Sequence, residues 1–181
     1  TIGDTENLDQ TLPLLAIRGF GQSEDQMVPL HMAMVASAVA NDGKMMKPYV
    51  GEATFDKAGR ELSRTEPEVW KMPISAETAA LETEFMVGVV ESGTASCCLA
   101  LDGGIQAAAK TGTAELGIAS NPDLSHAWIV AFAPADDPQF AVSVVLTDVQ
   151  STQDVSATGG RLAGPIAETM LNFLLTGQGA S

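Results

Sequence analysis

One short run of residues combines a cation, two hydroxyls and a glycine: Lys110-Thr111-Gly112-Thr113. Lys110 is the single charged residue between Gly103 and Ala114. Because alternate residues of a strand share a face, we expect Lys110 and Gly112 on one face and the two threonines on the other. Glycine lets a ligand approach the backbone closely. The segment therefore offers hydroxyls, backbone N–H donors and a positive charge to an anionic or carbonyl-bearing ligand. The alternative is an ordinary edge strand, protected from aggregation by its lysine.

Helices are predicted before this run. Pro29 suits the first turn of a helix that extends to about Asp42, and its nearly all-apolar surface predicts a buried helix. Ser75 is a good N-cap for a second helix. Between them, residues 51–72 are mixed and polar, which indicates a short hairpin with its turn at 57–60. The predicted buried stripe of the second helix, from the four-residue spacing, consists of Leu81, Phe85 and Val89.

Strands are predicted from about residue 105 onward, at 105–115, 127–132 and 140–149. The short, proline-flanked connection between the last two predicts an antiparallel hairpin. A closing helix is expected after Gly164. The order of helices, strands and helix predicts an α+β fold, with helices packed on an antiparallel sheet. The 181 residues suffice for one domain with a core.

Composition excludes several classes of function. The net charge of −14 argues against nucleic-acid binding, because phosphate contacts need clustered Lys and Arg. No metal or other cofactor is expected, since His31, His126, Cys97 and Cys98 lack metal-ligand spacing. A bridge between adjacent cysteines closes a strained ring, so we predict two unbridged thiols. His126 is predicted to be a structural residue at the start of a strand.

The order of several motifs resembles that of class B penicillin-binding proteins. Lys-Thr-Gly is the third motif of the serine acyltransferases, which also include class A β-lactamases. The similarity covers roughly residues 17–175, and the chain looks closest to the actinobacterial A-type proteins. The segments that carry the resemblance are Gly21-Gln22-Ser23, Val28-Pro29-Leu30, Ala40-Asn41-Asp42-Gly43, Ser92-Gly93-Thr94-Ala95, Lys110-Thr111-Gly112-Thr113-Ala114-Glu115, His126-Ala127-Trp128, Ser156-Ala157-Thr158-Gly159-Gly160 and Ala163-Gly164-Pro165.

The resemblance implies the C-terminal half of a peptidoglycan D,D-transpeptidase that forms a serine acyl-enzyme. It implies catalytic roles for Lys110 and Thr113, the backbone N–H of Thr113 being one oxyanion-hole donor. Thr111, Gly112 and Thr113 are implied to bind substrate, the two hydroxyls holding a carboxylate of a stem peptide or a β-lactam. Lys110 would add positive potential and hold the serine of the second motif.

The other two motifs of this family, Ser-x-x-Lys and Ser-x-Asn, do not occur in the sequence. We therefore expect residues 1–181 to be the C-terminal portion of the domain, with the nucleophile upstream of Thr1. No apolar run reaches the roughly 20 residues that span a bilayer. A membrane anchor, which would place the enzyme on the outer face of the cell membrane, is likewise expected upstream.

Two other functions stay open at this point. A penicillin-sensing or non-catalytic penicillin-binding module would carry the same third motif, and so would a serine β-lactamase. The segments around Pro29 and Asn41 favour the transpeptidase. Such a chain is also expected to expose a broad apolar face, through which it would pack against the rest of its domain or self-associate.

Overall fold

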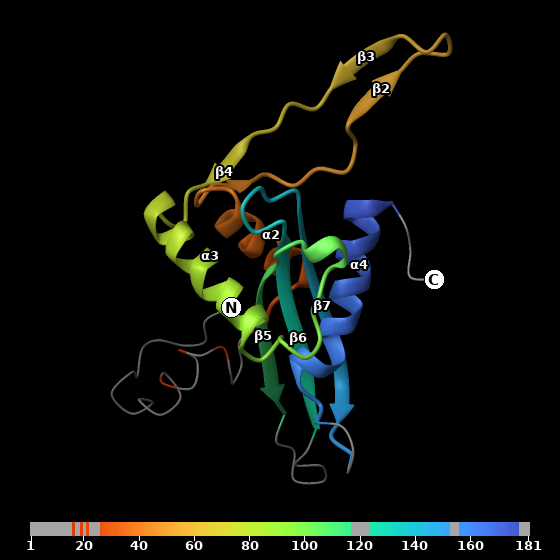
Figure 1. Cartoon of the computed structure of the whole chain (residues 1–181). Helices are drawn as coiled ribbons and strands as arrows, with labels where there is room; N and C mark the ends of the chain where they lie inside the picture. Colours follow the sequence, from red (N-terminus) through yellow and green to blue (C-terminus); the bar gives the residue numbers. More distant parts are fainter. Residues whose placement is uncertain are drawn as a thin grey trace, which may run out of the picture.

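The computed structural model describes residues 16, 19, 21, 26–116, 124–152 and 156–177, and its centre is an antiparallel sheet (Figure 1). Three strands, β5 (Ala108–Glu115), β6 (Leu124–Ala133) and β7 (Phe140–Gln150), lie in the order β5-β6-β7. In the register Gly112 lies opposite Trp128 and Thr113 opposite Ala127. The predicted strands and the β6–β7 hairpin are confirmed. The predicted motif segment at Gln22 and Ser23 lies outside the described residues.

Helices cover both faces of this sheet, so β6 is buried on its two sides. α2 (Pro29–Ala40) and α3 (Ala76–Glu91) pack on one face, where Val130 and Phe132 join a core cluster with Met86. α4 (Gly164–Thr176) packs on the other, where Ile129 and Leu171 belong to a second cluster. The alternation along β6 sends successive residues into different cores. The α+β class predicted from the order of elements is confirmed.

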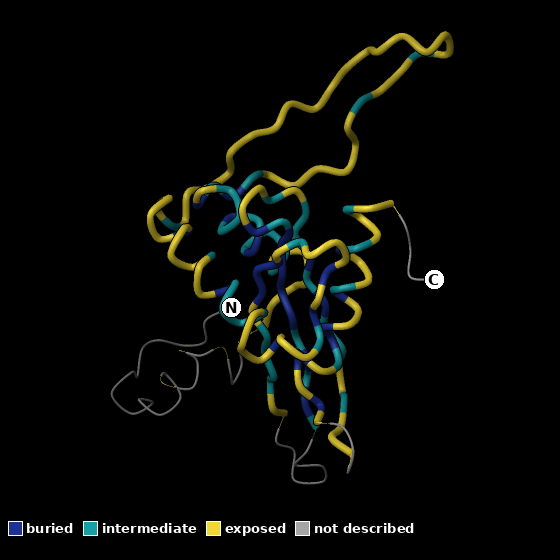
Figure 2. The backbone as a smooth tube through the Cα atoms, viewed as in Figure 1, coloured by how far each residue is buried: buried dark blue, intermediate teal, exposed yellow. Residues whose placement is uncertain are grey.

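An arm leaves this body between α2 and α3, and it stands clear of the sheet (Figure 1). At its base β1 (Met45–Met46) pairs with β4 (Val69–Lys71), and further out β2 (Ala53–Phe55) pairs with β3 (Glu61–Arg64). Almost all of its residues are exposed (Figure 2). The hairpin predicted within 51–72 is thus present, but it contributes nothing to either core.

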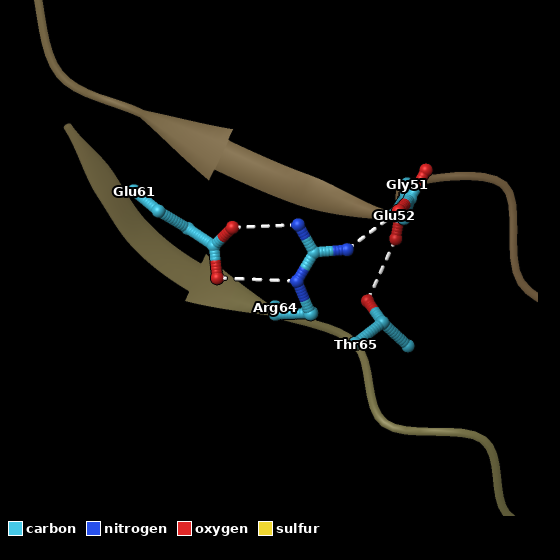
Figure 3. Close-up of polar contacts among 5 residues, drawn as sticks. All are labelled: Gly51, Glu52, Glu61, Arg64 and Thr65. Atoms are coloured by element: carbon cyan, nitrogen blue, oxygen red, sulfur yellow. Dashed lines mark hydrogen bonds and ion pairs between the residues drawn. The ribbon is translucent and has the colours of Figure 1, made fainter. Parts of the chain in front are cut away.

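Polar contacts hold the outer part of the arm together (Figure 3). Arg64 Nη2 donates to Glu61 Oε2 at 2.6 Å, and Arg64 Nη1 donates to Glu52 Oε1. The hydrogen bonds to Glu61 and then to Glu52 raise the pKa of Arg64 above its ordinary value. Thr65 Oγ1 donates to the carbonyl of Gly51 at 2.7 Å. Since the pairs are exposed, they order the arm more than they stabilise it.

The buried face predicted for α3 is wrong, although its N-cap is confirmed. Ser75 Oγ accepts from the backbone N–H of Thr78 at 3.1 Å. Of the three residues in the predicted stripe, Leu81 and Phe85 are 50% and 60% exposed, and only Val89 packs, partly buried, against a core; Ala79 and Met86 are buried instead. The helix has two apolar ridges, and i, i+4 spacing does not tell which ridge faces the sheet.

Two further predictions need correction. α2 was expected to be buried, yet Leu30 is 60% exposed and only Ala36 and Ala38 are buried, while Met32 and Val39 pack partly buried against the core beneath the helix. Cys97 and Cys98 were expected to be unbridged thiols, but they form a disulfide with their Cα atoms 3.7 Å apart. The turn after α3 brings the two sulfur atoms together. Among the described helices, none is both long and apolar enough to cross a bilayer.

Candidate active-site strand

The residues with chemical potential lie on β5, which is an edge strand within the described part of the chain. Its one strand partner there is β6, so among the described residues no strand lies along the opposite edge. Lys110 to Thr113 occupy the middle of the strand. An edge of this kind accepts an extended peptide as an additional strand.

The two faces of β5 are different, as predicted from alternation. Ala108, on the Lys110 face, belongs to the core beneath α2 and α3, and Ala109, on the Thr111 face, belongs to the core beneath α4. The strand pattern thereby places both threonine side chains on the α4 side. Lys110 and Gly112 lie on the α2–α3 side.

Both threonine hydroxyls are held by segments that are distant in sequence. Thr111 Oγ1 lies 2.6 Å from Thr94 Oγ1, in the turn after α3. Thr113 Oγ1 accepts from the backbone N–H of Gly159 at 3.4 Å. These contacts set the positions of the two hydroxyls before any ligand arrives.

Lys110 is exposed, in contrast to the alanines that precede it. Its Nζ donates to the carbonyl oxygen of Thr111 at 2.6 Å. The ammonium group therefore lies along the strand, beside the residues predicted to bind a carboxylate. It provides positive potential on a chain whose net charge is −14.

Glycines allow a second backbone to lie directly on β5. They belong to the π-helical turn η3 (Gly159–Ala163), which precedes α4. A Cβ on Gly159 would lie 2.0 Å from the carbonyl oxygen of Trp128 and 2.6 Å from that of Gly112. A Cβ on Gly160 would lie 2.1 Å from the carbonyl oxygen of Thr94. No side chain fits between these backbones.

The structure brings together the four predicted site residues and adds three that were not predicted as functional: Thr94, Gly159 and Gly160. Thr94 lies 17 residues before Thr111 and has no chemistry of its own that would single it out. The adjacent glycines were a usable signal, because a glycine pair directly before a helix indicates close approach of two backbones.

Residues considered for other roles lie elsewhere. His126 sits where the register of β6 and β7 shifts, and its Nδ1 accepts from the backbone N–H of Asp148 at 3.1 Å. This contact agrees with the structural role predicted for it, which stays a prediction. In the described part of the chain, no group of three or more His, Cys, Asp or Glu is arranged to hold a metal.

A groove of about 530 Å³ lies apart from β5, between α2 and the base of the arm. Val28 and Leu30 on one side are 65% and 60% exposed, and Trp70 on the other is 48% exposed. We call this surface the apolar face; Leu81 and Phe85 of α3 are exposed as well. The exposed apolar surface expected from the sequence is therefore present.

Comparison with known proteins gives a consistent result. The family described as the penicillin binding protein transpeptidase domain matches residues 10–172. Peptidoglycan D,D-transpeptidase PbpA of Mycolicibacterium smegmatis is 38% identical over 157 residues, which are 87% of this chain and 31% of the relative. The PbpA of Mycobacterium tuberculosis is 34% identical over 91% of this chain and 32% of its own length.

Solved structures agree with the sequence relatives. The crystal structure of PBPA from Mycobacterium tuberculosis superposes with a TM-score of 0.75 at 34% identity, covering 90% of this chain and 35% of that one. Its penicillin G acyl-enzyme complex gives a TM-score of 0.76. The chain thus spans about a third of the length of these relatives. The resemblance to actinobacterial penicillin-binding proteins is confirmed, and the chain belongs to the penicillin-binding protein transpeptidase domain family.

Proposed function

We propose that the protein containing this chain is a peptidoglycan D,D-transpeptidase that works through a serine acyl-enzyme and is acylated by β-lactams. The observation that carries the proposal is the edge of β5, where Lys110 bonds the carbonyl of Thr111 and the two threonine hydroxyls are held on the other face of the strand. The names of the relatives, and the penicillin G acyl-enzyme of one of them, support it.

In the proposed reaction a serine oxygen attacks the carbonyl between two D-alanines of a stem peptide. The C–N bond breaks, the terminal D-alanine leaves with the serine proton on its amine, and an ester remains on the serine. The amine of a second stem peptide then attacks that ester, forming the cross-link and returning the proton to the serine.

The residues of β5 take the roles that their positions permit. The backbone N–H of Thr113 donates to the oxyanion that develops on the attacked carbonyl, and a donor of this kind contributes about 3 kcal/mol to lowering the barrier. The hydroxyls of Thr111 and Thr113 bind the terminal carboxylate. Lys110 supplies positive potential beside them, and Gly112 keeps the strand accessible to the acyl group.

The nucleophile, in this proposal, belongs to a part of the protein outside these 181 residues, because the sequence contains no Ser-x-x-Lys. The chain would then be the C-terminal portion of the transpeptidase domain. The remainder of the domain would cover the apolar face, where Leu30 is 60% and Trp70 48% exposed. The enzyme would act outside the cytoplasm, held by an anchor upstream of the chain.

A fluorescent penicillin tests the proposal directly. The full-length protein is expected to become covalently labelled, and the 181-residue chain alone is expected to stay unlabelled. A donor stem peptide and an acceptor amine should then yield a cross-linked product with the full-length protein. Labelling without any cross-linked product would indicate a penicillin sensor instead, and absence of labelling would refute the acyl-enzyme.

A further inference from the structure

A residue outside the four-residue motif shares a hydrogen bond with it. Thr94 belongs to the turn between α3 and β5, and its Oγ1 lies 2.6 Å from Thr111 Oγ1. Both groups are hydroxyls, and each has one proton to donate and lone pairs to accept with. The direction of this hydrogen bond therefore decides what Thr111 offers to a ligand.

The turn that carries Thr94 is firmly attached to the fold. Ala95 is fully buried, and its N–H donates to the carbonyl of Val89 at 3.1 Å. The N–H of Cys98 donates to the carbonyl of Ala95 at 2.9 Å, and Cys98 is joined to Cys97 by the disulfide. A side chain on such a turn keeps its position relative to β5.

The backbone of η3 closes the other side of Thr94. An added Cβ on Gly160 would lie 2.1 Å from the carbonyl oxygen of Thr94 and 3.6 Å from Thr111 Cγ2. Gly160 therefore lies against the backbone of Thr94, with the methyl group of Thr111 just beyond it. Thr94 and Thr111 are packed against the same backbone segment, which limits how far the two hydroxyls can separate.

We propose that Thr94 is a positioning residue that donates its proton to Thr111 Oγ1. An ionised carboxylate only accepts hydrogen bonds, so Thr111 must donate to it. With its own proton donated to the carboxylate, Thr111 Oγ1 can still accept a hydrogen bond through a lone pair. In this proposal the Thr94 hydroxyl donates that hydrogen bond. This hydrogen bond orients the O–H bond of Thr111 toward the ligand. It also polarises the Thr111 hydroxyl, which strengthens the hydrogen bond that Thr111 donates. This inference rests on the proposed function of Thr111 as a carboxylate-binding residue.

Two conservative substitutions in the full-length protein test the inference. Thr94→Val keeps the shape and removes the donor, whereas Thr94→Ser keeps the donor and removes a methyl group. The second-order rate of acylation by benzylpenicillin is expected to fall about three- to tenfold in T94V, the range of one net hydrogen bond. It should stay within about twofold of wild type in T94S. A slow T94S with an unaffected T94V would overturn the role of the hydroxyl.

The methyl ester of benzylpenicillin separates positioning from a general structural effect. It lacks the charged carboxylate, so it forms a weaker hydrogen bond with Thr111. T94V is expected to slow acylation by this ester no more than about twofold. Equal slowing of the acid and the ester would show that Thr94 acts on the fold rather than on the carboxylate.

A control and a double variant complete the test. Ser96→Ala removes a hydroxyl from the same turn, one that donates to the carbonyl of Gly93 at 2.8 Å. This control should leave unchanged the ratio of the acylation rates measured with benzylpenicillin and with its methyl ester.

In a Thr111→Val background, T94V should cause no further decrease in the rate of acylation by benzylpenicillin; additive losses would contradict the inference. If the wild-type protein is not acylated, the proposed function is wrong. If the wild type is acylated and T94V is acylated at the same rate, the proposed function stands and the role of Thr94 is wrong.

Discussion

The glycine that packs against β5, Gly159, is a stringent place to perturb the protein. Gly159 lies so close to β5 and β6 that an added Cβ would be 2.0 Å from the carbonyl oxygen of Trp128 and 3.0 Å from the backbone nitrogen of Gly112. Those atoms belong to the paired strands β5 and β6. They have no rotamer into which they could withdraw, so in Gly159→Ala the backbone itself must move.

The size of the effect follows from these distances. Ordinary contact begins at 3.4 Å, so η3 has to retreat from the sheet by about 1.4 Å. Overpacking of this kind costs about 2–3 kcal/mol of the free energy of unfolding. For a domain of this size, such a loss lowers the melting temperature by about 4–12 °C. The hydrogen bond from the Gly159 N–H to Thr113 Oγ1, already 3.4 Å long, breaks as η3 withdraws.

Gly88→Ala is the matched control, because it makes the same chemical change where no atom outside the helix backbone lies within 4 Å. Alanine inside α3 should raise the free energy of unfolding by about 0.5–1 kcal/mol. Both variants would be measured in the complete protein by chemical denaturation and by penicillin acylation. We expect G159A to lose stability and acylation rate, and G88A to lose neither. A G159A protein with wild-type stability would refute the close backbone contact.

Four other predictions follow from the same structure. Lys110→Met should slow penicillin acylation at least about tenfold with no change in melting temperature, because the exposed ammonium group bonds only to its own strand among the described residues. Leu30→Asp should lower the free energy of unfolding of the complete protein by about 3 kcal/mol if the rest of the protein covers the apolar face. An unchanged unfolding curve would show that this face is not covered. Thiol alkylation should modify neither Cys97 nor Cys98 before reduction and both after it. Arg64→Gln should speed amide exchange in the arm without changing acylation, since the arm lies outside both cores.

Much of the fold was readable from local pattern. The three strands, their antiparallel hairpin, the start of α2 at Pro29 and the cap at Ser75 each depend on residues within one element. Such signals survive because local propensity and the global fold agree. Alternation along β6 also explains why Val130 and Phe132 share one core.

What the sequence did not predict depends on contacts between elements. Phe85 was assigned to a buried stripe, yet the sheet meets α3 through Met86, and helical spacing cannot choose between adjacent ridges. The disulfide between Cys97 and Cys98 depends on the path of one turn. Thr94 reaches Thr111 only because that turn passes β5. None of these contacts has a periodic signature.

The candidate site is defined by backbone contacts more than by side chains. Added Cβ atoms on Gly159, Gly160 and Gly164 would meet carbonyl oxygens of Trp128, Thr94 and Cys98 respectively, all within 2.7 Å. Main-chain contacts at three successive points fix how η3 and α4 sit against β5, β6 and the turn after α3. Side-chain rotamers can change without moving these contacts, but any residue larger than glycine moves them all. The hydroxyls of Thr111 and Thr113 are preorganised because the segments that hold them cannot slide, which is the property that the proposed carboxylate site needs.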